Sequence, residues 1–353
     1  MSDIKINNIT DRSGSSGPIF AGISTVSTSA FMIMPSGPTE FRGGRGRAVI
    51  GAGGYPSGTT GMDYVQISTT GNGNDFGDLS VGNYGRGSFS SSTRGVVGGG
   101  AGSSYVASIE YQIISSQGGS NDFGDLSIGL RFFRGTSNNN RGTWMGGQRP
   151  STDGETYAVI INFNEIATTG DANFFGNLFE ARTGANATLS SPTRGITAGD
   201  QGYSPYSGLG AVTNGIEFIT FATFGNGQDF GDLSTARSNP AGLSSNTRGV
   251  FGGGNPNQPS PNNKTDTMEF ITIASLGNVT DFGNLTASQN SAMGTSNNLR
   301  GIFAGGYITP AEINVIQYIT IASTGDAQDF GDLVNSKGYL PVAYSDSHGG
   351  IGE

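Results

Sequence analysis

The chain has 353 residues, 61 of them Gly, with only 13% charged residues and a formal net charge of −9. Because it has no Cys, disulfides, thiolate nucleophiles and zinc–thiolate sites are excluded, and the scarcity of Lys and of basic clusters argues against a nucleic-acid-binding surface. No run of 18 apolar residues is present, so no membrane insertion is expected. The 21 Phe and 12 Tyr argue against disorder, and a Gly-rich chain with many aromatics predicts an all-β fold with tight turns.

Residues 1–42 lie outside any repeat and predict an extended N-terminal arm. The first residues, MSDIKINNIT, lack the basic start and apolar core of a secretory signal. The arm is apolar and β-prone but too short to bury its own surface, so we expect it to order on assembly by strand addition to another chain. The residues predicted to make that contact are Ile4, Ile6, Ile19, Phe20, Ile23 and Phe31.

A hexapeptide close to QDFGDL occurs six times after the arm. Its Phe residues are 47 to 55 positions apart, at Phe76, Phe123, Phe175, Phe230, Phe282 and Phe330. Two other motifs keep the same period: an Arg-Gly followed by a short apolar run and a Gly pair, as in TRGVFGGG, and an apolar strand such as MEFITI. A period near 50 residues with several strand-like pieces per unit is typical of a β-propeller.

Each unit can be divided into four strands, and counting the units gives six blades over residues 43–353. The chain enters the first blade at its second strand, near Arg47. The segment Gly338–Gly352 is expected to supply the missing inner strand of that blade and then to begin another second strand. Such closure would remove the exposed edges of the ring.

The motif order of these units resembles the kelch repeat: an Arg, a short apolar strand, a double Gly, an aromatic third strand and an aromatic-x-x-Leu. This chain has the Phe of the hexapeptide where kelch repeats have Trp, and its single Trp, Trp144, lies in a second strand. The resemblance covers roughly residues 43–348 and implies a six-bladed kelch-like β-propeller.

The hexapeptide contains DFG, a metal-binding signature of protein kinases, but six copies in a chain with three Lys do not fit a kinase. The glycines of GNGNDFG do not fit a dinucleotide site either, because no strand–loop–helix context surrounds them. Repeated calcium sites remain an alternative, since GDAQDFGD places three Asp close together. We favour a structural interpretation in which Phe and Leu fill the wedge between blades. The flanking Asp would accept hydrogen bonds in the turn, and the recurring Arg would pair with one of these carboxylates or with a backbone carbonyl of its own or the adjacent blade.

The chain offers little for catalysis. Its single His, His348, takes the place of the recurring Arg in the C-terminal segment and is expected at the surface or at a blade edge. A Ser–His–Asp arrangement is therefore not expected elsewhere, and we predict no catalytic residue, no metal ligand and no cofactor. A carboxylate pair for glycoside hydrolysis remains an alternative, because Asp is plentiful.

The segments that break the repeat are the better candidates for function, because loops on a rigid scaffold usually carry it. The loops between second and third strands vary most, and alternating strand directions place all of them on one face. Tyr and Arg beside Ser, Gly and Asn suit a binding surface, although solvated loops without a function are the alternative. The candidates are Tyr55, Arg149, Tyr203, Tyr206 and Tyr307, together with Arg131 and Phe132 in LRFFRG on the same face.

The arm followed by blades of the type TRGVFGGG…IEFIT…DFGDL resembles structural proteins of tailed bacteriophages, especially those of marine cyanobacterial phages. The resemblance implies a non-enzymatic virion protein of a tail, fibre or other appendage, made in the host cytoplasm and oligomeric in the particle. Its implied partners are other virion proteins, bound through the arm, and a host surface glycan or receptor. A glycan-binding or glycan-cleaving propeller and a purely architectural neck or capsid-decoration protein are the alternatives.

Overall fold

The computed structural model describes residues 46–54, 58–150, 158–182, 186–204, 208–256, 263–338 and 340–352. The chain divides into two units, Met1–Gly44 and Arg45–Glu353, and all described residues belong to the second. The predicted boundary between residues 42 and 43 and the whole predicted arm lie outside the described residues. The described elements are strands, and no helix in these ranges has the length and apolar character needed to cross a membrane.

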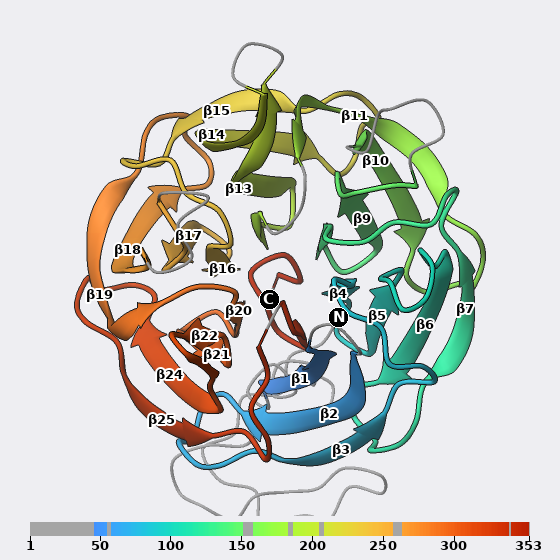
Figure 1. The fold of residues 1–353 in the computed structure, drawn as a ribbon, viewed down its shortest axis with the longest axis horizontal. Helices are drawn as coiled ribbons and strands as arrows, with labels where there is room; N and C mark the ends of the chain where they lie inside the picture. Colours follow the sequence, from blue (N-terminus) through green and yellow to red (C-terminus); the bar gives the residue numbers. More distant parts are fainter. Residues whose placement is uncertain are drawn as a thin grey trace, which may run out of the picture. The chain divides into compact units, whose positions relative to one another are not determined.

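Six four-stranded blades surround a central channel, which confirms the predicted all-β, six-bladed propeller, and a bridge between Arg182 and Gly202 joins the sheets of blades 3 and 4 (Figure 1). Each inner strand is only four residues long and ends in Ser, and its side chains alternate between the channel and the blade interface. The inner strands are β4 (Gly87–Ser90), β8 (Arg134–Ser137), β12 (Ala187–Ser190), β16 (Ala241–Ser244), β20 (Met293–Ser296) and β26 (Val342–Ser345).

The second strand of each blade begins at the recurring Arg and pairs antiparallel with the inner strand. The four residues after the Arg are buried in every blade whose burial pattern is described, as expected for a sheet packed on both faces. These strands are β1 (Arg47–Gly53), β5 (Arg94–Gly98), β9 (Arg141–Met145), β13 (Arg194–Ser204), β17 (Arg248–Gly252) and β21 (Arg300–Ala304).

The third strand carries the aromatic motif. It pairs with the second strand on one side and with the fourth strand on the other. The third strands are β2 (Thr59–Gln66), β6 (Ser108–Ile113), β10 (Ala158–Glu165), β14 (Gly208–Thr220), β18 (Thr265–Thr272) and β24 (Val315–Thr320).

The fourth strand forms the outer rim of each blade and contains the hexapeptide. A separate hairpin, β22 (Tyr307–Ile308) and β23 (Ala311–Glu312), lies in the second-to-third loop of blade 6. The fourth strands are β3 (Asn74–Asp78), β7 (Asn121–Asp125), β11 (Asn173–Arg182), β15 (Gln228–Asp232), β19 (Thr280–Gln289) and β25 (Gln328–Asp332).

The first blade combines both ends of the propeller sequence. β26 pairs with β1 from Ala48↔Ser345 to Gly51↔Val342, so the C-terminal strand supplies the inner strand of blade 1, as predicted. The expectation that another second strand starts after it is wrong. Beyond Ser345 the chain turns and contacts the terminal serines of β4, β8, β12 and β16. One edge of β26 pairs with β1 and the other faces the channel, so no further strand is added there.

The apolar core of the described residues is distributed over six clusters, one at each interface between adjacent blades. Every hexapeptide Phe is at most 3% exposed, and the Leu three positions later is also buried. The predicted wedge is therefore confirmed. Because each interface has its own cluster, ring closure joins six small cores and does not create a single large one.

Each blade also repeats a three-part contact that we call the latch. The recurring Arg lies over the aromatic ring of the third strand, with its guanidinium carbon 4.3 to 4.9 Å from the ring centroid. That ring meets the hexapeptide Phe edge to face, with centroids 6.0 to 6.1 Å apart. The Arg then donates to a backbone carbonyl of the next blade, as Arg248 does to Ile321 at 3.0 Å. Arg300 closes the ring by donating to Ile67 of blade 1 at 3.1 Å.

The latch confirms the predicted contact of the recurring Arg with a backbone carbonyl of the adjacent blade, and it rules out the alternative pairing with a hexapeptide carboxylate. Among the described residues, Arg141 is the one latch arginine with an ion pair, and its partner is Glu165 of the third strand. Buried ion pairs lie elsewhere, as between Arg182 and Glu217 at 2.7 Å. Stacking on the ring and donation to carbonyls already engage the guanidinium, which leaves the first Asp of the hexapeptide in solvent.

The hexapeptide Gly lets each blade bind the turn of its neighbour. Gly277 in the turn of blade 5 donates to the Phe230 carbonyl at 2.8 Å, and Asn278 accepts from the Asp232 amide at 3.0 Å. A Cβ on Gly231 would lie 2.4 Å from the Gly277 oxygen, so a larger residue would prevent this approach. The predicted acceptor was the hexapeptide Asp itself, and the structure instead uses the Asn or Asp of the neighbouring turn. The motif therefore joins blade corners. Within the described ranges, no group of three or more His, Asp or Glu could hold a metal ion.

Candidate functional site

Two kinds of loop meet at one end of the propeller, which we call the loop face. Because strand directions alternate, the loops between second and third strands lie beside the connections from one blade to the next. Isolated bridges join the two kinds of loop in several blades. These bridges are Tyr84↔Ala101, Arg131↔Gln148, Ser238↔Asn255 and Asn290↔Tyr307.

Aromatic side chains gather around Arg131 on the loop face, between blades 2 and 3. Arg131 donates to the Tyr84 hydroxyl at 2.8 Å and to the Gln148 side-chain oxygen at 3.1 Å. Its guanidinium carbon is 4.8 Å from the ring centroid of Tyr105 and 4.9 Å from that of Phe132. We call these five residues the Arg131 cluster. Arg131, Phe132 and Tyr105 are partly exposed, so the cluster presents aromatic surface next to a positive charge.

Phe132 adopts a left-handed backbone conformation, with a φ of +53°. The same position, two residues before the inner strand, is also left-handed at Gly85, Asn239, Ser291 and Leu340. The connection between blades therefore requires this conformation, which is unfavourable for a bulky aromatic residue and costs on the order of 1–3 kcal/mol. Phe132 is held there by its contacts with Arg131 and with Tyr84, whose ring centroid is 5.7 Å away.

The structure describes only some of the other predicted loop residues. Tyr307 lies in β22, where its hydroxyl donates to the Pro310 carbonyl at 3.1 Å and Lys264 lies 4.8 Å from its ring centroid. Arg149 is partly buried and follows Gln148 of the Arg131 cluster. For Tyr203 the structure describes only the backbone, in β13. Tyr55, Tyr206 and the arm residues Ile4, Ile6, Ile19, Phe20, Ile23 and Phe31 lie outside the described residues.

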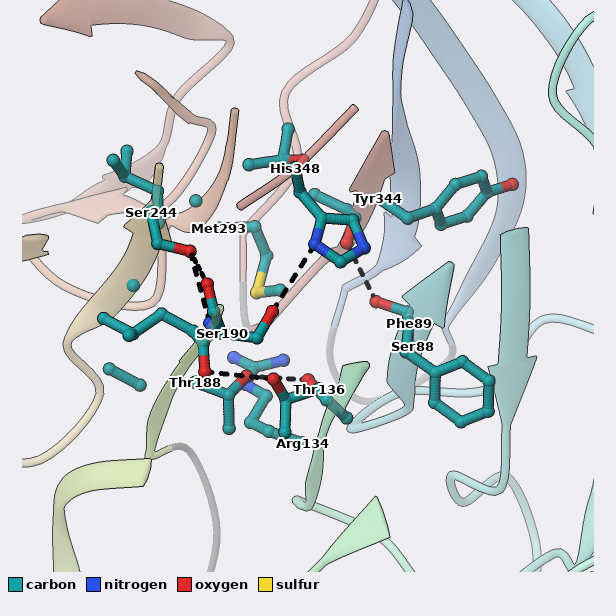
Figure 2. Close-up of a pocket in the computed structure, with 18 of the residues that line it drawn as sticks. Ser88, Phe89, Arg134, Thr136, Thr188, Ser190, Ser244, Met293, Tyr344 and His348 are labelled. Carbon is teal, nitrogen blue, oxygen red and sulfur yellow. Dashed lines mark hydrogen bonds between the residues drawn. The ribbon is translucent and has the colours of Figure 1, made fainter. Parts of the chain in front are cut away.

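The inner strands enclose a cavity of about 60 Å³ on the axis of the propeller (Figure 2). Residues that begin the inner strands, such as Arg134 and Met293, line the end nearer the loop face. The opposite end is lined by the serines that finish these strands. The small residues of the inner strands are visible in the sequence, but they did not predict a pocket there.

The terminal serines of the inner strands form a ring of hydrogen bonds. Each hydroxyl of Ser90, Ser244, Ser296 and Ser345 donates to the carbonyl of the corresponding Ser in the preceding blade, at 2.6 to 2.7 Å, and Ser137 donates to the Ser90 carbonyl at 2.6 Å. The step from Ser190 to Ser137 is the exception. There the C-terminal tail intervenes, with Gly350 so close to the Ser137 oxygen that an added Cβ would lie 1.9 Å from it.

His348 lies in this channel, so the prediction that it is a surface or blade-edge residue is wrong. Its Nε2 is 3.1 Å from the Ser90 carbonyl, and its Nδ1 accepts from the Gly350 amide at 3.1 Å. These partners assign the proton to Nε2 of a neutral ring. Burial lowers the pKa of His348 to about 4, and the hydrogen bond to Ser90 opposes that shift.

His348 also contacts two serines of the hydrogen-bonded serine ring. These contacts make the C-terminal tail a plug at this end of the channel. Ser137 Oγ is 3.3 Å from Nε2, and Ser190 Oγ is 3.5 Å from Nδ1. The Ser137 hydroxyl already donates to the Ser90 carbonyl, and Nδ1 is occupied by a backbone amide. The imidazole therefore ties the tail Asp346–Gly352 to the serine end of the channel, since Gly349 also donates to the Ser244 carbonyl at 3.1 Å.

Two residues that were not predicted from the sequence could have been found as departures from the repeat. Arg134 begins β8, where the other inner strands begin with Gly, Ala, Met or Val. Asp200 takes the place of the second Gly of the double-Gly motif, which is Gly in the five other units. Each departure alone looks like ordinary variation. Their proximity, through which the Asp200 charge acts on Arg134, becomes visible only in the folded ring.

The fold and its channel define a six-bladed β-propeller. The structure is similar to a solved structure of YjhT, with a TM-score of 0.63 over 80% of this chain and 94% of that chain. The two sequences are 11% identical, so the likeness concerns the fold alone. No protein-family model matches the chain, and no curated protein is similar to it in sequence.

Proposed function

We propose that this chain is a non-enzymatic structural protein of a tailed-bacteriophage virion, which presents the loop face of its propeller to a protein partner or a host surface. The virion assignment rests on the resemblance of the arm and the kelch-like blades to phage structural proteins. The arm, residues 1–42, attaches the protein to the particle. The observation that carries the role of the loop face is the Arg131 cluster.

The chemistry of the cluster suits recognition. Tyr and Arg supply much of the energy of binding interfaces because they combine large apolar area with hydrogen-bonding groups. Arg131 is fixed by Tyr84 and Gln148 before any partner arrives, so little side-chain entropy is lost on binding. An aromatic face beside a cation can pack on a protein side chain or on a sugar ring, which keeps a host glycan within the proposed partners.

Backbone strain at Phe132 supports the same role. Asn239 and Ser291 occupy the equivalent left-handed position in other blades with smaller side chains, so the fold itself does not need an aromatic residue there. Strained residues persist at binding sites because the surrounding structure holds them in place. The partly exposed ring of Phe132 is therefore better explained by contact with a partner than by a need of the fold.

The test separates attachment from recognition. Phage particles carrying the double variant Arg131→Ala/Phe132→Ala are expected to contain the protein at normal copy number, by quantitative mass spectrometry, but to adsorb to host cells at least tenfold more slowly. Particles encoding a chain without residues 1–42 are expected to lack the protein. Normal adsorption by the double variant would reject the role of the loop face, and incorporation of the truncated chain would reject the role of the arm.

A matched control uses a second aromatic residue, outside the Arg131 cluster. Phe179 is 76% exposed on β11, and Phe179→Ala removes an exposed aromatic ring without touching the Arg131 cluster. This variant is expected to assemble and to adsorb normally. Equal losses in Phe179→Ala and in the double variant would indicate a general effect of surface hydrophobicity.

A further inference from the structure

The channel contains a charged side chain whose position the fold does not explain. Arg134 is 3% exposed and lines the cavity, and its guanidinium has no hydrogen-bond or ion-pair partner among the residues the structure describes. Figure 2 places this guanidinium inside the pocket. Burying a guanidinium without hydrogen bonds is unfavourable, and the other inner strands have Gly, Ala, Met or Val at this first position. A ligand that accepts from Arg134 would remove this cost.

Asn186 provides a second, independent sign of a ligand. It is 1% exposed and lines the same cavity, immediately before β12. Its Nδ2 donates to the Thr197 hydroxyl, whereas its buried Oδ1 has no hydrogen-bond partner. Nearly all buried polar atoms in proteins are satisfied, so this acceptor, in a cavity that Arg134 also lines, indicates a missing group that can both donate and accept.

A strained acidic residue supports the charge of Arg134. Asp200 is fully buried and has a φ of +138°, where the five other units have Gly. Burial lowers the pKa of Arg134 to about 10, and the charge of Asp200 acts against that shift. An Asp in a conformation that suits Gly destabilises the backbone, so its place near the Arg134 guanidinium fits a need to keep that side chain charged better than a need of the fold.

The cavity wall adds hydrogen-bond acceptors. The hydroxyls of Thr136, Thr188 and Ser88 donate to the carbonyls of Leu189, Gly135 and Ala343, at 2.8 to 3.1 Å. Their oxygen lone pairs therefore remain available to accept from a ligand. At about 60 Å³ the cavity holds on the order of four to six waters, which limits the ligand to a few non-hydrogen atoms.

We propose that the channel binds a small carboxylate that also carries a hydroxyl or amino group. The carboxylate lies against the guanidinium of Arg134, whose planar fork matches two carboxylate oxygens. The hydroxyl or amino group donates to Asn186 Oδ1. The serine ring and the His348 tail close the cavity on the opposite side, so the ligand lies at the level of Arg134.

The test uses the full chain and glycolate as the probe, with calorimetric titration at constant ionic strength. Glycolate is expected to bind with a one-to-one stoichiometry. Acetate, which lacks the hydroxyl, is expected to bind at least fivefold more weakly, and glycolamide, which lacks the charge, is expected not to bind. A chain that binds none of these probes, or that binds glycolamide as well as glycolate, would overturn the proposal.

Variants assign the two contacts. Arg134→Met should abolish glycolate binding, whereas Asn186→Ala should reduce glycolate affinity to that of acetate. Arg141→Gln removes a guanidinium from the second strand of the same blade, outside the cavity, and should leave glycolate affinity unchanged. If Arg134→Met does not fold, Arg134→Lys keeps the charge and should lower affinity at least tenfold. Full glycolate affinity in a folded Arg134 variant would reject the site.

Discussion

The latches at the outer part of the propeller repeat the same residue types in every blade, whereas the channel wall changes from one blade to the next. Arg, an aromatic ring and Phe occupy each latch with nearly the same distances. In the channel, Arg134 and the plug at His348 each occur once. The repeated contacts are those that every blade interface needs for stability. The single ones are not required by the ring, and this is why we assign ligand binding to the channel.

The largest effect is expected where a latch loses its buried ring. Phe282 is 2% exposed, and Phe282→Ala should lower the free energy of unfolding by about 3–5 kcal/mol, because a cavity opens between blades 5 and 6. Chemical denaturation measures this change. Phe174 occupies another hexapeptide but is 60% exposed, so Phe174→Ala should change stability by no more than about 0.5 kcal/mol. Similar costs for both variants would contradict the wedge.

A smaller effect is expected from the arginine of the latch. Arg248→Gln removes the stacking on Phe270 and the hydrogen bond to the Ile321 carbonyl, and should destabilise the protein by about 1–3 kcal/mol. The stability of Arg248→Lys, which keeps the charge but loses the planar guanidinium, should lie between that of Arg248→Gln and that of the wild type. EDTA should leave the unfolding temperature unchanged. A strong shift in EDTA, with little effect of Arg248→Gln, would support calcium in place of the latch.

The plug predicts a pH dependence that the latches do not share. The pKa of His348 is lowered in the folded state to about 4, from an ordinary value of 6.5. The unfolded chain therefore binds a proton before the folded chain does, and the stability that is present above pH 6.5 is lost as the pH falls towards 4. The expected slope reaches about 1.4 kcal/mol per pH unit for one proton.

This slope can be isolated because the chain has one His. Between pH 6.5 and 5, thermal unfolding of the wild type should show it, and His348→Asn, which does not titrate, should largely remove it. The Phe282→Ala variant should keep the same slope as the wild type. An unchanged pH dependence in His348→Asn would place the imidazole in solvent and contradict the plug.

The smallest effect is expected in the serine ring, where the comparison is between two steps of one ring. Ser296→Ala loses a hydrogen bond of 2.6 Å to the Ser244 carbonyl and should cost about 1 kcal/mol. The Ser244 carbonyl keeps a partner in Gly349, which limits the loss. Ser190 contacts His348 at 3.5 Å, so Ser190→Ala should cost less. A larger cost for Ser190→Ala would mean that the tail does not interrupt the ring as the structure indicates.

The sequence by itself determined the strand class, the six blades, the closure by the C-terminal strand and the burial of the hexapeptide Phe. The strands and the buried Phe recur about every 50 residues because each blade interface imposes the same packing, and this recurrence can be read from the sequence without coordinates. The closure follows from the incomplete first blade. The tertiary structure decided what the Arg of each unit contacts, where His348 lies and which residues share the channel. The channel takes one short strand from each blade, so Arg134, Asn186 and His348 are far apart in the chain and meet only when the ring closes.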